Sequence, residues 1–260
     1  QLSDPSDEVG AEAAFGLGQL QFWNVTPLER TQLTVQIEEA LLHELDDCRR
    51  ELRWGDPARS EFCRVVVRSL GVVGGEGANE MLWDQLSRGI ASPDLQRAVA
   101  LALAVQAKGG RGVAISAERV SWLAPMLIEK DNPSQWAAAY LLARAEVAED
   151  ARASVVTLLR LAWDRAGSET VRAWLLRALG KHDPESETVA EVLEDRASTP
   201  RLVVNAARAA GPSHKGSLRA RLALGDREGV HAEVLGAFAR LVALPANPDG
   251  AAPAAEATDP

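Results

Sequence analysis

The side chains that carry most protein chemistry are few in this sequence, and they are widely spaced. The chain has four histidines, and His43-Glu44 is its single His-Glu pair. The other histidines, His182, His214 and His231, fall in predicted turns or at helix starts. No His-Glu-x-x-His, Gly-x-Ser-x-Gly or Cys-x-x-Cys motif occurs, so the zinc-protease, hydrolase and thiol-redox templates all fail. We therefore expect no catalytic site, no cofactor and no metal in this chain.

A series of arginines is the strongest candidate for binding. Each occupies the same place in a repeated segment, three residues before its closing residue. The series consists of Arg68, Arg144, Arg177 and Arg208, while Ala104 and Ala239 interrupt it. On helices packed roughly 8–10 Å apart, such guanidiniums would form a ladder, which could clamp an acidic peptide through bidentate carboxylate bonds. The alternative is that these arginines are ordinary surface residues, each paired locally with an acid.

The two cysteines lie at similar distances on either side of a predicted turn near Gly55 and Asp56. Cys48 and Cys63 would therefore sit at similar heights on two antiparallel helices. They could be two small buried hydrophobic residues. They could instead form a disulfide, which would indicate an oxidising compartment.

The chain has seven tryptophans, most of them on apolar helix faces. We expect large rings there to fill the gaps between helices. Trp54 stands in a polar turn and is our candidate for an exposed anchor, because tryptophan is enriched at binding hot spots.

The elements that must position these residues are helices. Between Ser168 and Gly180, Val171, Trp174 and Leu175 begin an apolar pattern with steps of three and four residues, which is typical of one helix face. Ser168 is expected to be the N-cap of this helix, because serine is a preferred residue type there. Gly180 is expected just past the helix end, where a left-handed backbone is easiest for glycine.

Shifted copies of this unit close at residues 71, 107, 147, 180, 211 and 242, at intervals of 31 to 40 residues. Proline stands near the head of several copies, at 57, 93, 133 and 200, where its missing N–H is tolerated. This self-similarity predicts a helical solenoid. The expected helix pairs cover 28–48 and 58–70, 79–89 and 94–107, 117–129 and 134–147, 150–166 and 169–179, 185–196 and 200–210, and 215–224 and 228–244.

The segment from Asp4-Pro5 to Leu20 resembles a HEAT repeat of the short bacterial, phycobilin-lyase type, and so does the segment from Val171-Arg172 to Gly180. The resemblance implies an all-α, right-handed α-solenoid of about six to seven HEAT-like hairpins. It also implies a single repeat domain over residues 1–244 whose first repeat lacks its first helix. The Pro- and Ala-rich segment 245–260 has no apolar periodicity, and we expect a disordered tail or linker there.

Composition narrows the possible partners. The formal net charge of −9 disfavours nucleic acid, because affinity for phosphate backbones comes mainly from lysine and arginine. No apolar run is long enough to span a membrane. No signal peptide is visible, but a preceding segment of a longer protein could carry one. The sequence therefore leaves two alternatives for the location of the protein. It is either cytoplasmic, or periplasmic or lipid-anchored.

These observations favour a non-catalytic scaffold that binds a protein or an acidic peptide on the concave surface formed by the second helices. The alternative is a targeting or regulatory module of a larger enzyme. Bacterial peptidyl-prolyl isomerases with HEAT-like repeats are one such family, which the segment from Ala14 to Leu20 resembles. HEAT-repeat di-iron hydroxylases carry His-Glu pairs on several helices, and the single pair at His43 is too few to hold two irons.

Overall fold

The computed structural model describes residues 14, 16, 26–51, 57–90, 92–110, 114–225 and 228–243. This part of the chain folds into twelve α-helices and two short 3-10 turns. The α-helices are α2 (Pro27–Glu51), α3 (Pro57–Val73), α4 (Glu76–Ser87), α5 (Pro93–Lys108), α6 (Ala117–Ile128), α7 (Gln135–Arg144), α8 (Arg152–Arg165), α9 (Glu169–His182), α10 (Glu187–Glu194), α11 (Pro200–Ala209), α12 (Lys215–Ala223) and α13 (Glu228–Ala243). Helices occur in all the predicted ranges, with bounds shifted by a few residues.

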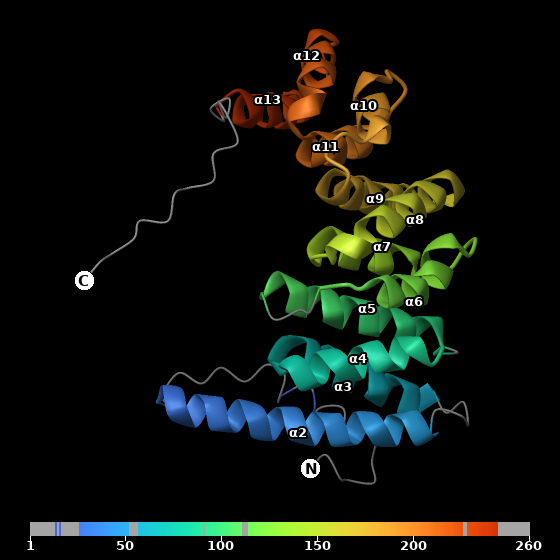
Figure 1. The fold of residues 1–260 in the computed structure, drawn as a ribbon, viewed down its shortest axis with the longest axis vertical. Coiled ribbons are helices and arrows are strands. Elements are labelled where there is room, and N and C mark those ends of the chain that lie inside the picture. Colours follow the sequence, from blue (N-terminus) through green and yellow to red (C-terminus); the bar gives the residue numbers. More distant parts are fainter. Residues whose placement is uncertain are drawn as a thin grey trace.

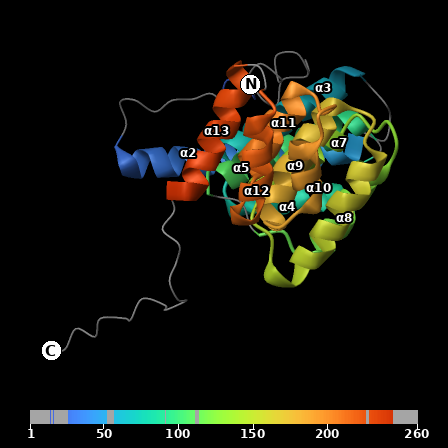
Figure 2. The same cartoon turned by 90° about the horizontal axis from the view of Figure 1, so that it is seen from above.

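Consecutive helices pair, and the pairs stack along one long axis (Figure 1). The second helix of each pair packs on the second helix of the next, giving the row α3, α5, α7, α9, α11 and α13. The described residues form no strand, and their single β-bridge joins Ile115 to Val147. Seen along the stack, α2 and α13 extend to the same side (Figure 2). The fold is therefore all-helical and built like a helical repeat protein.

Proline and hydroxyl side chains set several helix starts. Pro93 and Pro200 occupy the first positions of α5 and α11. The hydroxyls of Ser92 and Thr199, just before them, accept backbone N–H groups of the first turn. α7 differs from the prediction, because it begins two residues after Pro133. Proline therefore marks the start of some of the described helices, and it does not fix the exact residue at which α7 begins.

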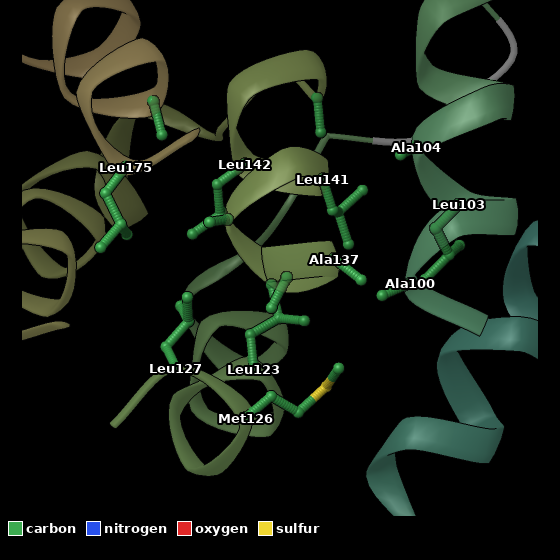
Figure 3. Close-up of a cluster of buried hydrophobic side chains, with 14 of the residues drawn as sticks. Ala100, Leu103, Ala104, Leu123, Met126, Leu127, Ala137, Leu141, Leu142 and Leu175 are labelled. Carbon is green, nitrogen blue, oxygen red and sulfur yellow. The ribbon is translucent and has the colours of Figure 1, made fainter. Parts of the chain in front are cut away.

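The core is continuous from one pair of helices to the next. Leu123 of α6 and Leu141 of α7 are almost fully buried and belong to one cluster, which Leu103 of α5 faces from the side (Figure 3). Leu175 of α9 closes this cluster from the other side (Figure 3). Burying a leucine side chain contributes about 1.5–3 kcal/mol. Because no single pair encloses such a leucine, the pairs stabilise one another.

Gly71 and Gly180 lie inside helices where a neighbouring helix comes close, and this corrects our prediction for Gly180. Gly180 belongs to α9, and it does not follow the helix in a left-handed conformation. A Cβ on it would lie 2.2 Å from the carbonyl oxygen of Ala209, on α11. A Cβ on Gly71 of α3 would lie 2.7 Å from the Cα of Ala102, on α5. Both glycines are therefore required for the close approach of neighbouring second helices.

Polar side chains from a later helix bind the last carbonyls of an earlier one. The bonds run from Gln106 Nε2 to the carbonyl of Leu70 (3.0 Å), from the ring Nε2 of His182 to that of Leu142 (2.8 Å), and from Lys181 Nζ to that of Arg144 (2.8 Å). The last carbonyls of a helix have no partner within it, so the bonds to Leu142 and Arg144 satisfy acceptors at the end of α7. The carbonyl of Leu70 also accepts the backbone N–H of Gly74 at 2.8 Å, so the bond from Gln106 is its second. These bonds tie α5 to α3 and α9 to α7.

The first described pair is joined covalently. Cys48 of α2 and Cys63 of α3 form a disulfide, with their Cα atoms 5.8 Å apart, and both residues are fully buried. Of the two alternatives for these cysteines, the structure has the disulfide. A second contact extends from α2 to α4, where Glu38 Oε1 accepts the backbone N–H of Ala78 at 2.9 Å. That carboxylate thus binds the first turn of α4.

The tryptophans that the structure describes lie in the core or pack against it partly buried. Trp83 is buried, and its ring centroid lies 6.2 Å from that of the half-buried Trp122. Trp54, our candidate for an exposed anchor, lies outside the described residues. So do the tail 245–260 and almost all of the first HEAT-like segment.

Candidate functional site

Three of the four predicted arginines come together on neighbouring second helices. Arg144, Arg177 and Arg208 lie on α7, α9 and α11, and α9 packs against both of the other helices. The positive charges of Arg208, Arg144 and Arg240, which is on α13, all act on the guanidinium of Arg177. We call Arg144, Arg177, Arg208 and Arg240 the arginine strip.

Arg177 is the central member of the strip. Its side chain is half-buried, and it has neither a hydrogen bond nor an ion pair within the described part of the chain. Burial, followed by the positive charges of Arg208 and Arg144, holds the pKa of Arg177 below its ordinary value. The carboxylate of Glu233 also acts on Arg177, with the opposite sign, but it is hydrogen-bonded to Arg208. A half-buried cation among other cations is unfavourable unless a further anion joins it. The surroundings of Arg177 therefore favour a negatively charged ligand.

Arg144 is held by an aromatic pair. Its guanidinium carbon lies 5.2 Å from the ring centroid of Tyr140, one helical turn earlier. That ring meets the ring of Trp174 edge to face, with 4.5 Å between centroids. The Nε of Arg144 is buried, and no hydrogen bond reaches it from the described residues. Stacking thus orients the guanidinium but leaves a donor unsatisfied.

Arg208 already has a carboxylate partner. Its Nε and Nη2 donate to the two carboxylate oxygens of Glu233, on α13, at 3.1 and 2.5 Å. The hydrogen bond from Arg208 lowers the pKa of Glu233, and the bond to Glu233 raises the pKa of Arg208. Both groups are therefore charged at neutral pH. The pair shows how a carboxylate binds side-on to one member of the strip.

Arg68 is not part of the strip. It is exposed on α3, which is separated from α7 by α5. Arg240 is part of the strip, and sequence reasoning missed it. The repeat alignment assigned Ala239 to that place, and Arg240 is the next residue. A shift of one residue in the last repeat would have found it.

The histidines have separate surroundings. His43 is exposed and lies 3.8 Å from Asp47 on the same helix. His182 and His214 are buried and bind backbone carbonyls, of Leu142 in the first case. Within the described ranges, no group of three or more His, Cys, Asp or Glu side chains is placed to hold a metal ion. Two of these histidines thus serve the packing of helices.

None of the helices described by the structure is both long enough and apolar enough to cross a membrane.

Comparison with models of known protein families finds no match to this chain. Comparison with curated proteins finds none either. Among solved structures, human deoxyhypusine hydroxylase in complex with glycerol aligns with 92% of this chain and 82% of its own, at 19% identity and a TM-score of 0.35. The aligned structure is also helical, like the fold described above. At this TM-score the alignment assigns no activity to the chain.

The comparison does correct one expectation. We expected a purely non-catalytic scaffold, or a regulatory module beside a catalytic one, and the solved structure that aligns with nearly the whole chain is an enzyme. A helical-repeat fold therefore does not indicate a role without catalysis, because both catalytic sites and binding sites occur on such folds. The expectation of a purely non-catalytic scaffold is withdrawn.

Proposed function

We propose that the arginine strip binds an acidic segment of a protein or peptide. The observation that carries the proposal is Arg177, a half-buried cation with no hydrogen-bonded counter-ion among the described residues and with Arg144 and Arg208 on either side. Carboxylates on a peptide would supply the missing negative charge. The proposal concerns binding and assigns no reaction to this face.

The geometry favours carboxylates for two reasons. A guanidinium presents two parallel N–H donors that match the two oxygens of one carboxylate, as Arg208 does with Glu233. The guanidinium of Arg144 adds a second cation beside Arg177. Next to these charges, the half-buried rings of Tyr140 and Trp174 provide an apolar surface for the rest of a peptide.

The frame that presents the strip is, in our proposal, a right-handed solenoid of six to seven HEAT-like hairpins that forms one domain over residues 1–244. Support comes from the paired helices and the continuous row of second helices. In such a frame every second helix adds its own residues to one shared surface. An extended ligand could then contact α7, α9, α11 and α13 at once.

The test is a titration with a fluorescently labelled peptide rich in Asp and Glu, followed by anisotropy at low and moderate salt. We expect Arg177→Gln to weaken binding by about 10-fold or more, because a hydrogen bond to a charged group contributes about 1.5–3 kcal/mol. Arg68→Gln is the matched control, since it removes the same charge outside the strip. Binding should also weaken as salt increases.

Two outcomes would overturn the proposal. One is equal loss of affinity in the Arg68 and Arg177 variants, which would indicate a general charge effect. The other is tighter binding of single-stranded DNA than of the acidic peptide, which would indicate a nucleic-acid surface.

A further inference from the structure

Glu233 stands where a ligand's carboxylate is expected. It belongs to α13, yet both of its carboxylate oxygens accept hydrogen bonds from Arg208 on α11. Arg177 and Arg240 also act on it, and together with the bond from Arg208 they keep the pKa of Glu233 low. Glu233 is thus an acid of this chain whose charge interacts with three members of the arginine strip.

The contact is open to exchange. The side chains of Arg208 and Glu233 are 47% and 34% exposed, so water and ions reach both groups. Ion pairs with this exposure contribute little to stability, and salt screens them. An incoming carboxylate could take over both donors of Arg208 at small cost in stability. The strip would then gain a ligand contact only by giving up an internal one.

We propose that Glu233 is an internal competitor for Arg208, which an acidic ligand must displace before it engages the whole strip. The inference rests on the proposed function and adds a residue that sets its affinity and selectivity. A ligand that carries a correctly placed carboxylate replaces Glu233 on Arg208. A ligand without one leaves the pair in place and contacts fewer members of the strip.

The experiment uses the intact chain and the same labelled acidic peptide. Glu233→Gln removes the competing charge, and we expect binding to tighten by about two- to five-fold, which is the range that an exposed ion pair can supply. Glu191→Gln is the matched control, since it removes one exposed acidic charge from α10. It should leave the affinity unchanged.

A second comparison separates the release of Arg208 from a general gain in positive charge. When Arg208→Gln is also present, Glu233→Gln should tighten binding less, because the guanidinium that is hydrogen-bonded to Glu233 is no longer there to be released. Circular dichroism and thermal melting check that α13 stays folded in each variant. If Glu233→Gln tightens binding equally with and without Arg208, the inference is overturned.

The failure of this inference differs from the failure of the proposed function. If the unmodified chain binds the acidic peptide and requires Arg177, but Glu233→Gln leaves the affinity unchanged or lowers it, Glu233 is a structural partner of Arg208 and the inference alone is wrong. If the unmodified chain and the Glu233→Gln variant both fail to bind the peptide, the proposed function is wrong. The inference about Glu233 is then wrong as well.

Discussion

Helices α3 and α9 occupy equivalent places in their repeats but have different surroundings. In each, a glycine inside the helix allows an alanine of the next second helix to come close, at Gly71 and Gly180 respectively. Three residues earlier, each helix has an arginine, Arg68 or Arg177. Arg68 is exposed, whereas Arg177 is half-buried. The two helices therefore share the close glycine–alanine packing, but their arginines differ in exposure.

The neighbouring helices explain this difference. α9 lies between α7 and α11, which provide Arg144 and Arg208. α3 is followed by α5, where Val105 is 41% exposed and no arginine aligns with the series. An arginine at the same place is thus part of a cationic strip in one repeat and an exposed charge outside that strip in another. The lesson is that a binding face in a stacked protein depends on runs of adjacent repeats.

Covalent attachment gives the largest expected difference between the two helices. α3 is bonded to α2 through Cys48–Cys63, across a separation of 15 residues, and a disulfide that closes such a loop contributes about 3 kcal/mol. Replacing both cysteines by alanine should lower the stability of the first pair by about this amount. Hydrogen exchange should show faster exchange in α2 and α3, with α9 unchanged. Equal acceleration in α9 would show that the stack unfolds as one unit.

Glycine packing should give the next largest effect. Gly180→Ala is expected to destabilise the protein by about 1–3 kcal/mol, the usual range for overpacking, because its Cβ would lie 2.2 Å from the Ala209 oxygen. Gly71→Ala should cost less, since its closest contact is 2.7 Å. Urea unfolding measures both. The control is Gly216→Ala in α12, where no atom lies within 4 Å and a small stabilisation is expected. A harmless Gly180→Ala would rule out the close approach.

His182 of α9, which is buried against α7, should make the stability of the protein depend on pH. Burial lowers the pKa of His182, so the unfolded chain takes up a proton on this residue more readily than the folded chain. Its stabilising contribution should be complete above about pH 6.5, the ordinary value, and be lost as the pH falls below it. The loss is at most about 1.4 kcal/mol for each pH unit. Denaturant unfolding between pH 5 and 8 should show a shallower decline in His182→Gln, and identical declines would contradict the assignment.

The arginines themselves should give the smallest effect on stability. Arg177→Gln removes a half-buried cation from a cationic neighbourhood, so we expect it to raise stability by less than about 1 kcal/mol, most clearly at low salt. Arg68→Gln should change nothing measurable. Thermal melting at two salt concentrations makes the comparison. A destabilised Arg177→Gln variant would indicate that Arg177 already has an internal partner.

The sequence was sufficient to predict the helices, because apolar spacing and proline position are local signals. It misplaced Gly180, since a glycine after Leu179 has the same local pattern whether it ends a helix or faces a neighbour. The arginines that it singled out, Arg144, Arg177 and Arg208, lie on α7, α9 and α11. It could not predict which of them lose water, or that Glu233 pairs with Arg208, because both depend on the packing of α11 and α13.

The bonds from later helices to earlier carbonyls give the stack a direction. Leu70, Leu142 and Arg144 receive their partners from residues 36 to 40 positions further along the chain. As the polypeptide leaves the ribosome, an earlier helix is therefore completed only after the following pair has been made. The end of α7 is thus completed by the helix pair that follows it, so its ordering lags one step behind synthesis.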